Sequence, residues 1–147
     1  MKPLIVLLLS FCLAVIGTKI FLHKYDFALS MRIGMSVMLI FTAFAHFAFS
    51  KGMTMMIPDF IPFKKGMVYG TGIFEIIAAI GLQITGVRSM TGWLLIIFFV
   101  LMLPANINAA RKHIDYQKGN YEGMGLKYLW FRVPLQIVFI LWTLFSL

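Results

Sequence analysis

The fold class is decided by residues 91–110, which read TGWLLIIFFVLMLPANINAA and contain no charged side chain. A helix crosses the hydrocarbon core of a bilayer with about 20 mostly apolar residues, so this one stretch is long enough to span a membrane. The rest of the chain has the same character, because 61% of its 147 residues are hydrophobic and only 12% are charged. A soluble fold of this size cannot bury that much apolar surface. The composition therefore excludes a soluble enzyme, a disordered chain and a disulfide scaffold.

Four further apolar stretches of similar length accompany this one. Each is predicted to be a helix, because lipid would leave the backbone groups of an isolated strand unpaired. Short polar connections separate the stretches, which predicts antiparallel packing of neighbours. We expect an all-α integral membrane protein, in which residues 1–27 form an N-terminal transmembrane helix and residues 28–147 form a four-helix membrane domain. The five transmembrane helices of this antiparallel bundle are expected over residues 4–22, 28–49, 67–85, 91–110 and 126–147.

The basic residues predict the orientation of the bundle. With five spans, the side of the N-terminus carries Lys2, Lys51, Lys64, Lys65, Arg111, Lys112, Lys118 and Lys127, against Lys19, Lys24, Arg32 and Arg88 on the other side. The positive-inside rule then places the N-terminus in the cytoplasm and the C-terminus outside, and we expect a bacterial inner (cytoplasmic) membrane. We interpret the net charge of +8 as a sign that basic side chains contact anionic head groups of the lipid bilayer. No Gly-rich phosphate loop or basic–aromatic pattern favours nucleic acid as a partner.

Five polar residues within the predicted spans are the candidate ligand-binding residues: His46, Glu75, Asn106, Arg132 and Gln136. Ionisable groups in a membrane are costly and usually face the interior of a bundle. Four separate helices place these groups in the same half of the bilayer, which indicates a polar pocket open toward the cytoplasmic side. An alternative interpretation is structural, with Glu75 and Arg132 forming an ion pair and the amides joining helices.

The surroundings of this cluster refine the expectation. Around Glu75, the positions at helical spacing are Gly72, Ala78 and Ala79, and small residues are typical of close helix contacts in membranes. Glu75 is therefore predicted to face a neighbouring helix rather than lipid. Pro104 cannot donate a backbone hydrogen bond, so it frees a carbonyl four residues earlier for a polar side chain.

Residues 53–63, MTMMIPDFIPF, form an unusual connection. The segment is too apolar for a solvated turn and too interrupted by proline to span. We expect it to lie at the interface or to dip into the membrane as a cap beside the polar cluster. A Met-rich cap suits varied apolar ligands, whereas the alternative is simple interfacial anchoring.

Other chemistries have little support in the sequence. No His, Cys and carboxylate cluster has the spacing of a metal site, so no metal is expected. The single cysteine, Cys12, lies inside the first apolar run and has no partner for a disulfide. No Ser–His–Asp or Cys–His arrangement is evident.

Several of these motifs together resemble the DoxX-like family of small integral membrane proteins, from residue 31 to residue 147. The matching pieces are Arg32, residues 45–47 (AHF), 57–62 (IPDFIP), 72–76 (GIFEI), 103–107 (LPANI) and 130–136 (WFRVPLQ). The resemblance implies a DoxX-like four-helix core and an accessory or ligand-binding subunit of a membrane redox system. It also implies a membrane redox protein, such as an oxidoreductase complex, as partner and a quinone- or lipid-like molecule in the pocket. It assigns no catalytic residue.

Two further functions remain open from the sequence. The first is a membrane enzyme acting on a lipophilic substrate, with Glu75 or His46 as acid/base and Arg132 setting the charge. The second is a small transporter component. That role would need oligomerisation, because the chain has no internal repeat of the kind that many transporters use.

Overall fold

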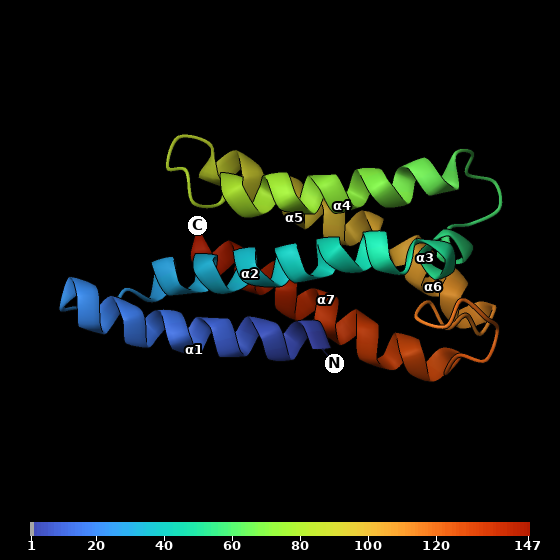
Figure 1. Ribbon diagram of the computed structural model, residues 1–147, viewed down its shortest axis with the longest axis horizontal. Coiled ribbons are helices and arrows are strands. Elements are labelled where there is room, and N and C mark those ends of the chain that lie inside the picture. The colour runs from blue at the N-terminus through green and yellow to red at the C-terminus, as the bar shows by residue number, and fades with distance from the viewer. Residues whose placement is uncertain (1) are drawn as a thin grey trace.

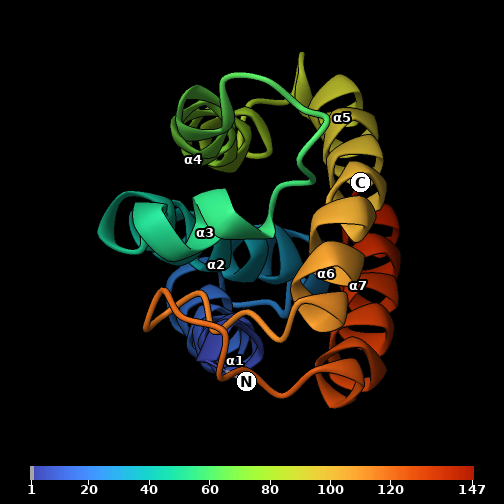
Figure 2. The ribbon, with the colours of Figure 1, turned by 90° about the vertical axis from the view of Figure 1, so that its right-hand side faces the viewer.

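The computed structural model describes residues 2–147, and within them the chain forms seven helices and no strand (Figure 1). The helices are α1 (Lys2–Leu22), α2 (Phe27–Ala48), α3 (Ser50–Met56), α4 (Lys64–Gly81), α5 (Arg88–Leu101), α6 (Leu103–Arg111) and α7 (Leu126–Ser146). Helices α1, α2 and α4 run along the long axis of an elongated bundle, and α7 and the α5–α6 pair cross them obliquely (Figure 2), while the two short helices lie together near one end.

Four helical stretches are long and apolar enough to cross a membrane: α1, α2, α7, and α5 together with α6 over Arg88–Arg111. The chain thus has the build of a helical membrane protein. The third predicted span, residues 67–85, corresponds to α4, which is not among these four. This helix has 18 residues and carries Lys64, Lys65 and Glu75, so it is the shortest and most polar of the long elements.

The predicted continuous helix over residues 91–110 is interrupted in the structure. Helix α5 ends at Leu101 and α6 begins at Leu103, with Pro104 in the first turn of α6. Proline has no N–H to donate to the carbonyl of Val100, so the regular hydrogen-bond ladder breaks at this point. The break frees backbone carbonyl groups at the level of the predicted polar cluster.

Helix α2 forms the centre of the bundle and contacts α1, α4 and α7, as the view along the bundle shows (Figure 2). The side chains of Met35, Met38 and Leu39 on α2 are almost completely buried. They pack with Leu7 of α1, Leu82 after α4, and residues of α5 and α7 in one apolar core. These side chains join α1, α4, α5 and α7 to α2 at the centre of the bundle.

Helix α1 packs closely against α2 because Gly34 has no side chain. A Cβ atom at this position would lie 3.1 Å from the carbonyl oxygen of Leu7. The indole N–H of Trp142 on α7 donates to the carbonyl of Met31 at 3.0 Å, and the ring of Phe11 packs edge-on against Trp142 at 5.1 Å. The first helix is therefore packed into the bundle through both α2 and α7.

Candidate functional site

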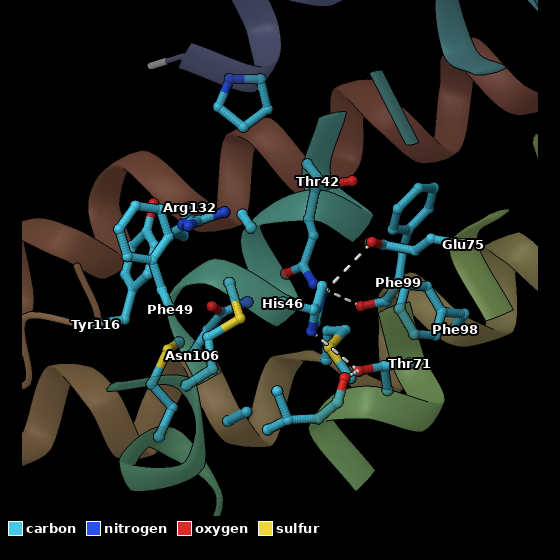
Figure 3. Close-up of a pocket in the computed structure, with 18 of the residues that line it drawn as sticks. Thr42, His46, Phe49, Thr71, Glu75, Phe98, Phe99, Asn106, Tyr116 and Arg132 are labelled. Atoms are coloured by element: carbon cyan, nitrogen blue, oxygen red, sulfur yellow. Dashed lines mark hydrogen bonds and ion pairs between the residues drawn. The ribbon is translucent and has the colours of Figure 1, made fainter. Parts of the chain in front are cut away.

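A cavity of about 1140 Å³ lies between α2, α4, the α5–α6 pair and α7. Helix α3 and the segment after it border one end, and the beginning of α1 contributes Lys2, Pro3 and Val6 to the wall. Most of the lining is apolar. The cavity is nevertheless lined by all five candidate residues from the sequence: His46, Glu75, Asn106, Arg132 and Gln136. Figure 3 shows the first four of them. Residues from four helices thus meet around one space.

One wall of the cavity carries His46 of α2 and Glu75 of α4. Their Nε2 and Oε2 atoms lie 3.5 Å apart, and Thr71 Oγ1 lies 3.1 Å from His46 Nδ1 on the other side of the ring. The Thr71 hydroxyl donates its one proton to the carbonyl of Val68 at 2.8 Å. It can therefore only accept from His46, so Nδ1 carries a hydrogen and Nε2 faces Glu75.

The geometry makes His46 and Glu75 partners of each other. Among residues 2–147, His46 is the one basic side chain within 4.0 Å of the Glu75 carboxylate. An unbalanced charge would be costly at this site, because the side chains are only 13% and 7% exposed. Both side chains line the cavity.

The close approach of α2 and α4 depends on Gly72. A Cβ atom there would lie 3.0 Å from the Cβ of His46 and 3.3 Å from the ring of Phe47. Farther along the same contact, Ser36 donates to the carbonyl of Ala79 at 2.7 Å. The prediction that Glu75 faces a neighbouring helix is confirmed, since its exposed fraction is 5% and its carboxylate is directed at α2.

Arg132 of α7 occupies a different part of the cavity wall (Figure 3). Its guanidinium lies 5.1 Å from the ring centre of Tyr128 and 5.7 Å from that of Tyr116, as cation–π contacts do. The alternative interpretation, in which Glu75 and Arg132 form an ion pair, is wrong, because His46 is the partner of Glu75. Two tyrosine rings, rather than a carboxylate, fix the guanidinium.

Asn106 and Gln136 are held by neighbours that the sequence did not indicate. The hydroxyl of Tyr128 donates to Asn106 Oδ1 at 3.3 Å. Gln136 Nε2 donates to the carbonyl of Phe99 at 2.5 Å, close to the break before Pro104. A polar side chain thus does bind a carbonyl beside the proline break, and it comes from α7 rather than from the asparagines of α6.

Two buried acceptor atoms that border the cavity have no hydrogen-bond partner among residues 2–147. They are Glu75 Oε2 and Gln136 Oε1. Buried oxygen atoms are rarely left without a donor. Since His46 Nε2 stands at ion-pair distance from Glu75 rather than at hydrogen-bond distance, the carboxylate has room for a donor from a bound molecule.

The Met-rich segment predicted as a cap begins with helix α3 and continues as an irregular stretch over residues 57–63. Its side chains Met53, Met56, Ile57, Phe60 and Ile61 line the cavity. The segment therefore lies beside the polar cluster, although its first half is a regular helix rather than an irregular loop.

Asp59 ties this segment to two helices. Lys64 of α4 donates to its carboxylate at 2.8 Å, and Lys112 after α6 donates at 2.5 Å. The hydrogen bonds from Lys112 and Lys64 lower the pKa of Asp59 to about 2. The amide of Asn108 adds a third link, because it donates to the carbonyl of Met56 at 2.8 Å.

The sequence did not indicate several residues of the site. Tyr116 lies in the polar connection before α7, where an aromatic residue gives no periodic signal. Thr71 and Tyr128 are common helix residues, and their roles depend on the neighbours they meet. Among residues 2–147, no group of three or more His, Cys, Asp or Glu side chains comes together as a metal site.

Comparisons with known proteins give one match. A family model described as a domain of unknown function (DUF8561) matches residues 35–146, which include most of α2 and every later helix. No curated protein and no solved structure matches the chain. All five candidate residues lie within the matched region.

Proposed function

The chain belongs to the DUF8561 family, a domain of unknown function, and we propose that its intramembrane cavity binds a lipophilic molecule with a polar group, quinone- or lipid-like. The observation that carries this proposal is the cavity itself. It has about 1140 Å³ of space, predominantly apolar walls and a few convergent polar side chains. This combination is typical of small-molecule sites.

The proposal places the protein in a bacterial inner membrane with five spans. Helix α4 would be the fifth, and its exposed face supports this assignment because it presents Ile73, Ile77 and Ile80. Its one acidic residue, Glu75, is buried against α2. The excess of basic residues at the end that carries α3 supports a cytoplasmic N-terminus and an external C-terminus.

We further propose an accessory or ligand-binding role in a membrane redox system, as the resemblance to DoxX-like proteins implies. The arrangement of the resembling motifs supports this proposal. The pieces AHF, GIFEI, LPANI and WFRVPLQ each contribute a polar residue to the cavity wall, and IPDFIP contributes apolar ones. Copurification of a redox protein with the tagged chain from its native membrane would support this role.

A second candidate function is an enzyme that acts on a lipophilic substrate. The observation that favours it is the His46–Glu75 couple, which places an imidazole and a carboxyl group with an unpaired Oε2 atom at the cavity wall. A group placed in this way suits general acid–base catalysis. The cavity would hold the substrate in either case.

The experiment that tests the binding proposal is native mass spectrometry of the purified chain after mild detergent exchange. We expect the wild type to retain a lipophilic molecule and A45F, which fills the cavity, to lose most of it. The matched control is I77F, which adds similar bulk on the exposed face of α4. Equal occupancy in A45F and the wild type, or no retained molecule in either, would contradict the proposal.

A further inference from the structure

The cavity is lined by more basic than acidic side chains. Among its lining residues within the described chain, Glu75 is the one acid, whereas Arg132, Lys2 and His46 can each carry a positive charge. Glu75 and His46 face each other at 3.5 Å, so the one acid of the cavity already has a basic partner. Arg132 and Lys2 are then left without a balancing charge inside the cavity.

Arg132 is arranged to receive a ligand. The guanidinium lies over the rings of Tyr116 and Tyr128, and its five N–H donors exceed what the Tyr128 hydroxyl beside it can accept. Within residues 2–147, no carboxylate lies within 4.0 Å of these nitrogens. Arg132 therefore combines a fixed orientation with an unpaired charge.

Asn106 adds a second donor beside the arginine. Its Oδ1 atom accepts from the hydroxyl of Tyr128, which also packs against Arg132. The amide NH₂ group is the part of this side chain that remains for a bound molecule. Arg132 and Asn106 together form a site that offers donors, with Tyr128 joining the two.

We propose that the ligand is an amphiphile with one anionic headgroup, a carboxylate or a phosphate, which binds Arg132 and Asn106. Its chain would lie along the apolar wall near Met38, Phe99 and Phe139. This inference rests on the proposed binding function and adds the charge of the ligand. Arg132 is half-buried and has no carboxylate partner among residues 2–147, and its planar donors match carboxylate and phosphate oxygens.

The size of the cavity agrees with a chain-bearing ligand, because it exceeds the roughly 300–1,000 Å³ of pockets for drug-sized molecules. A neutral quinone or alcohol would fill the same space but leave Arg132 without a counter-ion. The charge of the headgroup therefore separates this inference from the more general proposal.

The test is isothermal titration calorimetry of the purified chain in a non-ionic detergent. It measures the affinities of two probes with hydrocarbon chains of equal length, oleate and oleyl alcohol. We expect oleate to bind about tenfold or more tightly, as a charge-assisted contact implies. In R132Q the two affinities should become similar, whereas R132K should keep most of the preference. The matched control is R111Q, which removes an exposed charge at the end of α6. Lysophosphatidate against mono-olein, in the same format, shows whether phosphate replaces carboxylate.

Each outcome separates the two proposals. Equal binding of oleate and oleyl alcohol to the wild type overturns the anionic headgroup and leaves the binding function intact. A loss of preference in R111Q as large as in R132Q also overturns it, because the attraction would then be a general property of the basic surface. Failure of all four probes to bind the wild type overturns the binding function for lipid-like molecules itself. The comparison of acid and alcohol needs no variant, so it remains decisive if R132Q does not fold.

Discussion

Glu75 and His46 face each other across the contact between α4 and α2 with 3.5 Å between Oε2 and Nε2. Thr71 accepts from the opposite side of the imidazole ring and sets its orientation. The two side chains are nearly buried, and each offsets the energetic cost of burying the other in an apolar environment. Their relationship leads to the first prediction.

Removing one member of this couple should cost more than removing both. H46L leaves a buried carboxyl group without its partner, and we expect it to lower the free energy of unfolding by roughly 3 kcal/mol. E75L should have a similar effect through His46. The double variant H46L/E75L should lose much less than the sum, because apolar pairs can replace buried ion pairs at little cost. Denaturant unfolding in detergent measures all three, and additive losses would show that the two side chains do not interact.

Gly72 should be sensitive to the smallest possible substitution. In G72A the new methyl group would lie 3.0 Å from the Cβ of His46, so we expect α2 and α4 to shift and stability to fall by roughly 1–3 kcal/mol. The matched control is G70A in the same helix, where no atom lies within 4 Å. That variant should gain up to about 1 kcal/mol from helix propensity. Thermal unfolding in detergent checks the difference, and equal behaviour of G72A and G70A would argue against the close contact.

The connection over residues 57–63 should become more mobile when Asp59 loses its charge. Since Lys112 and Lys64 lower the pKa of Asp59 to about 2, the carboxylate stays ionised and the two ion pairs persist at neutral pH. They are lost as the pH falls from about 4 toward 2, because the stabilisation from a lowered carboxyl pKa disappears on protonation.

Hydrogen–deuterium exchange at matched pH tests this prediction. We expect D59N to exchange faster than the wild type over residues 57–63 at pH 7, with the difference shrinking as the pH falls toward 2 and Asp59 is protonated. Both ion pairs are exposed, so high salt should also reduce the difference. A difference that persists unchanged at low pH would mean that Asp59 acts other than through its charge.

The number of spans has a direct test. If α4 crosses the membrane with the other four stretches, the two ends of the chain lie on opposite sides, with the N-terminus in the cytoplasm. Fluorescent and phosphatase reporters fused to each end would then give opposite signals. Reporters on the same side would reduce the spans to the four that length and apolar composition already indicate.

The sequence predicts most of the long helices, because a rise of about 1.5 Å per residue sets the length of apolar run that crosses a bilayer. It does not predict which polar residues face each other. The sequence places His46, Glu75 and Arg132 in the same half of the bilayer, and in the structure all three line one cavity. The choice of His46 as partner depends on how each helix is rotated about its axis and on the close approach at Gly72.

Residues outside the predicted spans explain most of what the sequence missed. Tyr116 reaches Arg132 from a polar connection, where side chains follow no helical period. The break between α5 and α6 is a further case. Pro104 predicts a lost hydrogen bond, but a helix can kink or end at that point, and the packing around Phe99 and Gln136 decides which.

Helix α1 lies outside the region that the family model covers, yet Lys2, Pro3 and Val6 form part of the cavity wall. The region that the family model matches would therefore supply the polar interior of the site, while α1, which precedes that region, closes one flank. A shortened chain that starts at residue 27 should expose the cavity sideways to the acyl chains of the bilayer. Ligand would then enter the cavity from the lipid phase faster and less selectively. In the full chain, α1 would therefore restrict which molecules reach the cavity.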